Sequence, residues 1–193
     1  MTTSYCAHVR AHPEDSLHRA YHDTQYGFPL CDDAALFGRL VLEINQAGLS
    51  WTTILKKQAA FHHAYGDFDP ACVAAYGETD RARLLADAGI IRNRLKVDAA
   101  IENARRVLAL RPEYGGFRGW LDAHHPLELA DWTKRFKKTF VFTGGEIVKE
   151  FLMSTGYLPG AHDADCPVQA EILALEPAWA QRSRRTTSTS ERG

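Results

Sequence analysis

One acidic side chain, Glu43, lies inside a stretch that is otherwise apolar and helical in pattern. Hydrophobic residues follow Asp32 at intervals of three and four, and this spacing predicts a helix that buries one face. Asp32 or Asp33 is suited to be its N-cap, and Gly48 is suited to end it. Glu43 is therefore expected beside a hydrophobic core and away from open solvent. The apolar positions of this face are Leu36, Phe37, Leu40, Val41 and Ile44.

A second helix is expected immediately afterwards. Ser50 is a favourable N-cap for a helix that begins at Trp51 and continues with Ile54, Leu55 and Phe61 inward. Since Gly48 ends one helix and Ser50 caps the next, residues 48–50 should form a tight elbow. A buried acid, an elbow and an indole ring are thus predicted within one short stretch. By itself this pattern is also compatible with a purely structural carboxylate.

The rest of the chain has the pattern of further helices, so the predicted fold class is all-α. Residues 1–31 are expected to be irregular, and only residues 140–143 (Phe-Val-Phe-Thr) have the composition of a strand. We expect one compact domain over residues 1–180, or two closely joined lobes, and a disordered basic tail over 181–193. Asp69 and Pro70 mark the start of a short helix over Cys72–Tyr76. Further helices are predicted from Thr79 or Asp80 to Ala88, at Asn93–Leu110 and Phe117–Ala123, and after Gly144–Gly145.

Charge and cysteine content restrict the expected partners and compartment. The chain has 23 basic and 24 acidic side chains and a formal net charge of -1, so a nucleic-acid ligand would need a local basic patch. Its four widely spaced cysteines are typical of a reduced intracellular protein. There is no signal-peptide pattern, and no apolar run approaches the roughly 20 residues that span a bilayer. We expect a soluble, cytoplasmic monomer that does not bind membranes.

Residues 84–96 have the pattern of two helices joined by a turn with a single glycine, and three cations follow that turn. In a helix-hairpin-helix, the amides and the positive end of the second helix bind a DNA phosphate, and nearby cations add charge without reading any base. The alternative is an ordinary helical hairpin with a solvated basic face. The candidate DNA-binding residues here are Gly89, Ile91, Arg92, Arg94 and Lys96.

Cysteines and histidines near both ends of the chain could form a metal site. Cys6 and His22 lie early, and His162 and Cys166 lie late with a plausible local spacing. Two cysteines and two histidines suit tetrahedral zinc, and four protein ligands would make the ion structural because no position remains for an activated water. The alternative is two buried thiols and two surface imidazoles, since the Cys6–His22 spacing matches no common finger and other histidines compete.

Three aromatic residues, Tyr21, Tyr26 and Trp51, could form a slot for a flat ring. A cationic ring between such faces would gain about 2 kcal/mol when desolvated. Core packing is the alternative explanation for each of them.

Several motifs, in order along residues 5–170, resemble the bacterial 3-methyladenine DNA glycosylase I family. The resemblance implies an all-α, helix-hairpin-helix glycosylase fold in which Cys6, His22, His162 and Cys166 bind one structural zinc ion that joins the N- and C-terminal segments. It also implies double-stranded DNA with alkylated bases as partner, and hence an association with the bacterial nucleoid. The motifs are Ala-Tyr-His-Asp (20–23), Tyr-Gly-Phe-Pro (26–29), Leu-Glu-x-x-Gln-Ala-Gly-Leu-Ser-Trp (42–51), Ala-Gly-Ile-Ile-Arg-Asn-Arg-x-Lys (88–96), Phe-Thr-Gly (142–144) and His162-x-x-x-Cys166.

The resemblance also implies roles for individual residues. Glu43 would contact the exocyclic amine and a ring nitrogen of the damaged base, and Tyr21 and Trp51 would stack on it. Gly48 and Leu49 would fill the gap that the flipped base leaves in the duplex. The chain departs from the family pattern at His8 and at Tyr26, which stand where the family often has Trp, and at Gly160-Ala161 before His162.

The activity implied is hydrolysis of the N-glycosidic bond of 3-methyladenine, with free base as product. Methylation at N3 makes the base a cationic leaving group, so the protein mainly has to flip the nucleotide and recognise it. Related glycosylases carry a catalytic Asp about twenty residues past the hairpin, but residues 99–121 contain none. With no lysine nucleophile evident, we expect a monofunctional enzyme without lyase activity. The alternative is a non-catalytic helix-hairpin-helix DNA-binding protein; a zinc hydrolase is disfavoured because there is no H-E-x-x-H motif.

Overall fold

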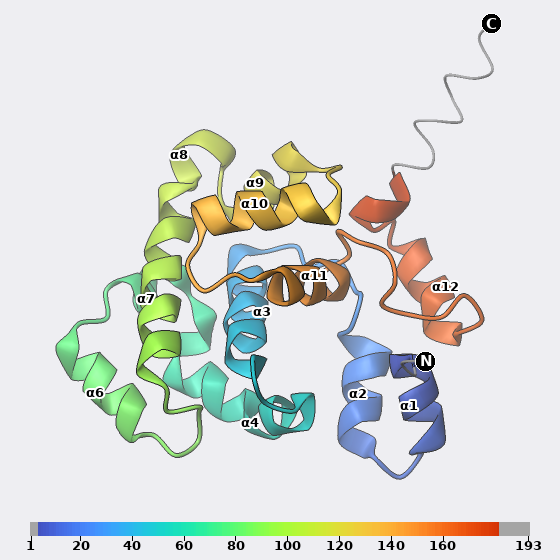
Figure 1. Cartoon of the computed structure of the whole chain (residues 1–193), viewed down its shortest axis with the longest axis horizontal. Coiled ribbons are helices and arrows are strands. Elements are labelled where there is room, and N and C mark those ends of the chain that lie inside the picture. Colours follow the sequence, from blue (N-terminus) through green and yellow to red (C-terminus); the bar gives the residue numbers. More distant parts are fainter. Residues whose placement is uncertain (1–3, 182–193) are drawn as a thin grey trace, which may run out of the picture. The chain divides into compact units, whose positions relative to one another are not determined.

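The computed structural model of the chain describes residues 4–181 and is helical throughout, which confirms the all-α prediction (Figure 1). No strand occurs within these residues. The chain divides into two compact units, which are described separately: residues 1–30 with 152–193, and residues 31–151. Over the same described span, no helix has both the length and the apolar character needed to cross a membrane.

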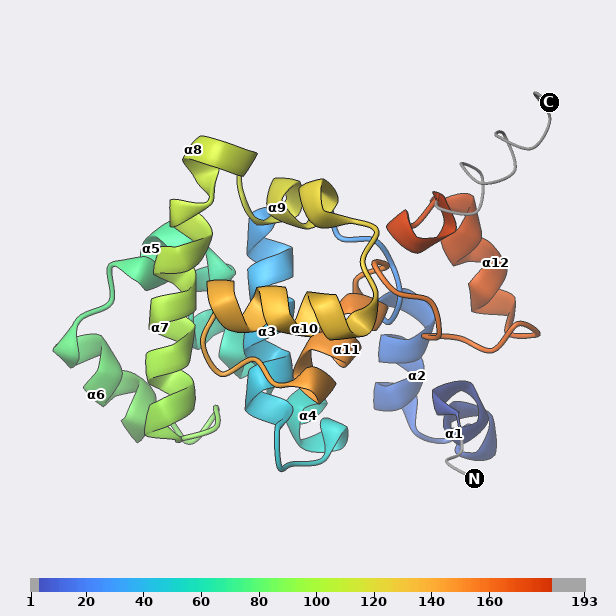
Figure 2. The same cartoon turned by 45° about the horizontal axis from the view of Figure 1, so that its top comes forward.

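The first unit contains α1 (Tyr5–Ala11), α2 (Ser16–Thr24) and α12 (Pro167–Ala174), with α1 and α2 side by side (Figures 1 and 2). The prediction that residues 1–31 are irregular was therefore wrong. Both early helices are short and separated by a turn at Pro13, and each begins at a side-chain cap. The Ser4 side chain accepts from Ala7 N, and that of Asp15 accepts from His18 N. Helices this short depend on packing and caps rather than on their own hydrophobic period.

The second unit is built around α3 (Asp33–Gln46), which contacts helices on several sides. Every residue from Leu36 to Asn45 is buried, so α3 is enclosed all round and not on one face only. Its other elements are α4 (Trp51–Ala64), η1 (Gly66–Phe68), α5 (Pro70–Ala74), α6 (Glu78–Ala86), α7 (Arg94–Ala109), α8 (Arg111–Tyr114), α9 (Phe117–His124) and α10 (Leu129–Thr139); α11 (Gly145–Ser154) contains the boundary between the units.

The predicted ends of α3 and the start of α4 are confirmed. Asp32 is the N-cap of α3, and its Oδ1 accepts from Ala35 N at 2.8 Å. Gly48 follows the end of α3 with a φ of +81°, a left-handed conformation that glycine adopts without strain. Ser50 caps α4 by accepting from Thr53 N. The neighbouring Asp33 has a different role, because its Oδ1 accepts from the Phe117 amide at the start of α9.

The predicted strand at residues 140–143 is wrong. Phe140 N donates to Phe136 O and so closes α10, and Phe142 has a φ of +60°, which no extended strand contains. The side chain of Asn103 on α7 replaces a partner strand: its Nδ2 donates to Val141 O at 3.0 Å, and Val141 N donates to its Oδ1 at 2.8 Å. The run is apolar because Phe140 belongs to the core, where aromatic rings of α9, α10 and α11 pack together.

Some helix positions also differ from prediction. The helix α6 begins after Gly77, whose N–H donates to Asp80, and it ends at Ala86, before the predicted Ala88. The helices α10 and α12 were not predicted. The start of α5 at Pro70, after the N-cap Asp69, is confirmed, but α5 ends at Ala74, before the predicted Tyr76. The helix predicted over Asn93–Leu110 is confirmed as α7, which begins at Arg94 with Asn93 as its N-cap. The predicted disordered tail lies outside the described residues except for Gln181, which is helical.

Candidate functional site

Glu43 is buried in α3, with 4% of its surface exposed, as the sequence predicted. It lies one helical turn before the end of α3. Trp51, the first residue of α4, is half-buried on the other side of the elbow. The elements packed around α3 account for the burial of the carboxylate, and exposed residues begin again at the elbow that follows. The second unit thus carries an acid and an indole on either side of one turn.

The elbow presents an apolar side chain to solvent. The Leu49 amide donates to Gln46 O at 2.7 Å, and the Gln46 side chain donates back to Leu49 O at 2.9 Å, which closes the turn on itself. Leu49 is 39% exposed in spite of its size. A Cβ added at Gly48 would meet nothing within 4 Å, so the tip of the elbow is open. A rigid turn that holds an exposed leucine is suited to enter another molecule.

The hairpin between α6 and α7 packs closely on α4. Gly89 N donates to Asp87 Oδ1 at 2.7 Å, and Asn93 Oδ1 accepts from Lys96 N at the start of α7. A Cβ at Gly89 would lie 2.9 Å from the Cβ of Ala60 on α4. Glycine is therefore needed here for close approach and not to end α6, which stops three residues earlier. Asn93 thus caps the amide of the third residue of α7.

We expect Gly89→Ala to lower the free energy of unfolding by about 1–3 kcal/mol, because a methyl group has to be forced into a packed contact. Thermal unfolding measures this. Gly77→Ala is the matched control: Gly77 has an ordinary φ of -107° and no atom near its missing Cβ, so a much smaller change is expected. Equal effects of the two substitutions would contradict close packing at the hairpin.

The three predicted cations of the hairpin separate into two kinds. Arg92 and Arg94 are exposed, and Arg94 lies 3.8 Å from Asp98. Lys96, which the sequence grouped with them, is only 6% exposed, and its Nζ donates to Asn45 O at 2.8 Å and to Ala47 O at 2.7 Å. Burial lowers the pKa of its ammonium group. The ammonium group of Lys96 thus binds the end of α3 instead of facing solvent. Ile91, another candidate DNA-binding residue, is half-buried in the turn.

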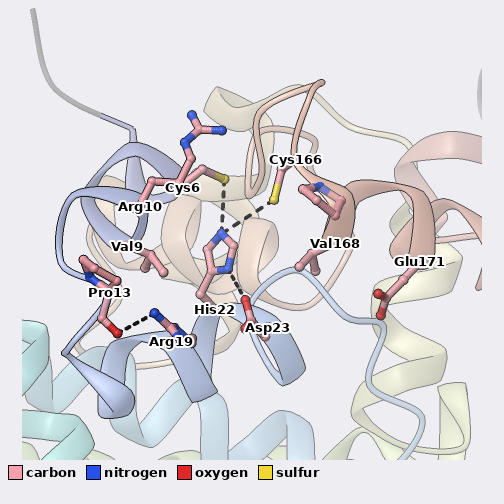
Figure 3. Close-up of a pocket in the computed structure, with 11 residues that line it drawn as sticks. Cys6, Val9, Arg10, Pro13, Arg19, His22, Asp23, Cys166, Val168 and Glu171 are labelled. Atoms are coloured by element: carbon pink, nitrogen blue, oxygen red, sulfur yellow. Dashed lines mark hydrogen bonds and ion pairs between the residues drawn. The ribbon is translucent and has the colours of Figure 1, made fainter.

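The predicted metal ligands come together in the first unit. Cys6, His22, His162 and Cys166 are all buried, and one ligand atom of each lies within 4.8 Å of the others. Figure 3 shows Cys6, Cys166 and His22 converging. The sulfur–nitrogen distances are 3.2 Å for Cys6–His22, 3.6 Å for Cys6–His162, 3.8 Å for Cys166–His22 and 3.6 Å for Cys166–His162. Sulfur and nitrogen ligands of a tetrahedral zinc ion lie about 3.6 Å apart, so the group is compatible with zinc.

Neighbouring groups orient both imidazoles. His22 Nδ1 donates to Asp23 Oδ1 at 2.7 Å, and His162 Nε2 donates to Tyr26 O at 2.7 Å, which leaves the other nitrogen of each ring facing the sulfurs. Such outer hydrogen bonds are usual for metal-binding histidines. Burial raises the pKa of the Cys6 thiol to about 11. The Asp163 amide, which donates to the Cys6 sulfur at 3.3 Å, acts in the opposite direction and lowers this pKa. A cation would favour the thiolate.

The predicted aromatic residues fall on both units. Tyr21 and Tyr26 are buried in the first unit, with ring centroids 5.7 Å apart, and half-buried His8 stacks on Tyr5 at 6.1 Å. Trp51 belongs to the second unit. Tyr5 was not predicted as a site residue, yet its ring packs edge-on against Tyr26 at 5.3 Å and its hydroxyl lies 2.8 Å from His18 Nδ1. Only its position beside Cys6 could have indicated it.

Comparison with known proteins gives a consistent result. Residues 11–137 match the methyladenine glycosylase family. A DNA-3-methyladenine glycosylase of Haemophilus influenzae is 33% identical over 80% of this chain and 93% of its own. The structure of 3-methyladenine DNA glycosylase I from Staphylococcus aureus superposes with a TM-score of 0.74 at 33% identity, over 80% of this chain and 92% of that one. A single-residue variant of such an enzyme in complex with 3-methyladenine gives 0.72 at 33% identity, over 80% and 93%. The chain therefore belongs to the methyladenine glycosylase family.

Proposed function

We propose that this protein is a DNA-3-methyladenine glycosylase, which hydrolyses the N-glycosidic bond of 3-methyladenine in double-stranded DNA and releases the free base. The observation that carries the proposal is the buried carboxylate of Glu43, one helical turn before an exposed elbow, in a chain of the methyladenine glycosylase family. A carboxylate held away from water attracts a cation more strongly than an exposed one does. A cationic base with an exocyclic amine complements it in charge and in hydrogen bonding.

Glu43 acts in this proposal mainly by recognition. As a carboxylate it accepts hydrogen bonds from the amine and complements the positive charge of the alkylated ring. Unmethylated adenine has the amine but lacks the charge, so a carboxylate held away from water discriminates between the two. The alkylated base is already a good leaving group, and water attacks the sugar. Trp51 stacks on the base, and Tyr21, Tyr26 and His8 are proposed as further aromatic contacts on the strength of the family resemblance.

Leu49 is proposed as the wedge. Taking a nucleotide out of the stack costs a few kcal/mol, and damaged pairs reduce that cost. An apolar side chain that fills the vacated space keeps the duplex from closing again. The exposure of Leu49 and the closed hydrogen bonding of its turn support this role, and Gly48 permits the turn.

We infer that the enzyme is monofunctional. A lyase needs an amine that is free to attack the sugar. Lys96, the lysine of the hairpin, instead donates from its Nζ to two backbone carbonyls. The chain also has no aspartate between residues 99 and 121, the region in which related glycosylases carry one. Strand cleavage at the abasic product is therefore not expected.

We further propose that Cys6, His22, His162 and Cys166 hold one zinc ion per chain. With four protein ligands the ion has no open position for water, so its role is to join residues 6 and 22 to residues 162 and 166 within the first unit. When bound, zinc supplies structural crosslinking and no step of the hydrolysis.

The test is release of 3-methyladenine from methylated duplex DNA, followed by electrophoresis of the DNA. We expect free base together with intact, alkali-labile strands. Binding to the DNA without release would favour the alternative, a damage-recognition protein, and strand cleavage without alkali would contradict monofunctional chemistry. Assaying several alkylated bases in parallel defines the substrate range.

Arg92 and Arg94 are proposed to contact phosphate beside the start of α7. Replacing either by alanine should weaken binding to all DNA sequences alike and reduce the slope of log K against log salt by about 1. Fluorescence anisotropy over a salt series measures this. Arg111 is the control, because it is equally exposed but lies beyond the far end of α7, about 24 Å along the helix. The same loss of slope in Arg111→Ala would contradict a hairpin-centred contact.

A further inference from the structure

Two lysines connect the elbow and the hairpin in opposite directions. Lys96 at the start of α7 reaches the end of α3, where its Nζ donates to Asn45 O at 2.8 Å and to Ala47 O at 2.7 Å. Lys57 on α4 reaches the hairpin turn, where its Nζ donates to Ala88 O at 2.7 Å and to Gly89 O at 3.3 Å. Each of the two turns therefore receives an ammonium group from the helix that follows the other turn.

The carbonyls that these lysines bind lie at the end of α3 and in the turn after α6. The last carbonyls of a helix have no partner within the helix and carry the negative end of its dipole, which favours a cation. This applies to Asn45 and Ala47 at the end of α3, whereas Ala88 and Gly89 lie in the turn beyond the end of α6. A charged donor satisfies such groups more strongly than a neutral one. An apolar residue in place of either lysine would leave two carbonyls of a turn to find other partners.

Close packing of the hairpin turn on α4 leaves the two turns little freedom. A Cβ at Gly89 would be 2.9 Å from that of Ala60 on α4, so the hairpin turn lies directly on the helix that the elbow introduces. Lys96 is 6% exposed, whereas Arg92 and Arg94 nearby are exposed. The cations of this region thus divide into those that face outward and those that hold the turns together.

We propose that Lys57 and Lys96 are positioning residues that lock the elbow (residues 47–50) and the hairpin turn (residues 87–90) into one rigid DNA-reading element. The inference rests on the proposed function, in which Leu49 enters the duplex and the hairpin binds phosphate. With the turns locked, seating the hairpin on the backbone fixes how deeply Leu49 reaches between the bases. Neither lysine touches the base or the sugar.

Excision and free-base binding separate this role from direct contact with the base. In Lys57→Met and Lys96→Met we expect release of 3-methyladenine from methylated duplex to fall about tenfold to one hundredfold, the range expected for losing charge-assisted hydrogen bonds. Binding of free 3-methyladenine should change by less than about threefold, because it requires no wedge. The double variant should lose little more than the worse single variant, since both lysines serve one element. Additive losses, or equal losses of base binding, would overturn the proposal.

Lys56→Met is the matched control, since Lys56 is the exposed neighbour of Lys57 on the same helix and carries the same charge. We expect its excision rate to stay within about threefold of the wild type, as for other surface substitutions. A loss in Lys56→Met equal to that in Lys57→Met would assign the effect to overall charge and overturn the lock.

Hydrogen exchange tests the lock without any activity. The Leu49 amide donates to Gln46 O and the Gly89 amide to Asp87 Oδ1, so both report on their turns. We expect Lys57→Met to accelerate exchange at Leu49 and Lys96→Met to accelerate exchange at Gly89. In each case the reporting amide is in the other turn, not in the one whose carbonyls the lysine binds. If Lys57→Met accelerated exchange only at Gly89, and Lys96→Met only at Leu49, the two turns would not be coupled and the proposal would be overturned. If the wild type releases no base, the proposed function fails, and these exchange rates still decide whether the lock exists.

Discussion

Glu43→Gln is expected to reduce release of 3-methyladenine from methylated DNA about one hundredfold, since hydrogen bonds to a charged group are worth about 1.5–3 kcal/mol. The substitution keeps the shape of the side chain but removes its charge and turns one acceptor into a donor that faces the amine of the base. Binding of free 3-methyladenine should weaken to a similar extent. Base release from methylated duplex and titration of the free base measure the two quantities.

Duplex affinity and stability decide whether Glu43 is a recognition residue or a structural one. Affinity for undamaged duplex should change little, because the proposed phosphate contacts are exposed cations of the hairpin and Glu43 is buried. Glu102→Gln is the control: Glu102 pairs with Arg106 at 2.7 Å on α7, so its loss removes only a surface ion pair. If Glu43→Gln lowered duplex affinity, base binding and unfolding temperature together, the carboxylate would be structural and the proposed reading of the base would fail.

The elbow could be predicted from sequence because its determinants are local. Asp32 and Ser50 each cap a helix through an amide three residues ahead, and Gly48 supplies the left-handed residue between the helices. None of these interactions requires knowledge of the rest of the chain. The same holds for Asn93 at the start of α7. The sequence predicted the burial of Glu43 for the right reason, but underestimated it, because helices from distant parts of the unit enclose α3 on all sides.

Features that depend on distant partners were missed or wrong. The run at 140–143 has strand-like composition, yet Asn103, far away in sequence, satisfies its backbone and Phe142 takes a left-handed conformation. Lys96 has the position of a phosphate-binding cation, and only the end of α3 shows where its ammonium goes. Lys57 gave no signal at all, because a lysine on an amphipathic helix is ordinary. Local chemistry thus predicts turns and caps, and tertiary contacts decide what each cation binds.

Removing a ligand of the proposed zinc site should have the largest effect on stability. We expect Cys166→Ala to lower zinc content from about one per chain to a small fraction and to lower the unfolding temperature by about 10–20 °C, because structural zinc contributes several kcal/mol or more. Elemental analysis and thermal melts measure this. Cys31→Ala is the control, since Cys31 is an exposed free cysteine outside the group. Full zinc retention in Cys166→Ala would refute this ligand set.

The size of that effect follows from how short the elements are that the four ligands join. Its helices α1, α2 and α12 have 7, 9 and 8 residues, too few to be stable in isolation. The core beside the four ligands is small: Cys6 and Cys166 themselves belong to it, with Val168 and Ile172. An ion shared by α1, α2 and the segment before α12 would therefore crosslink short elements that are not stable alone. Exchange of zinc for Cd²⁺, which also accepts tetrahedral thiolate ligands, should then preserve both the fold and base excision. A loss of excision in a folded, Cd²⁺-loaded protein would instead give the metal a part in the chemistry.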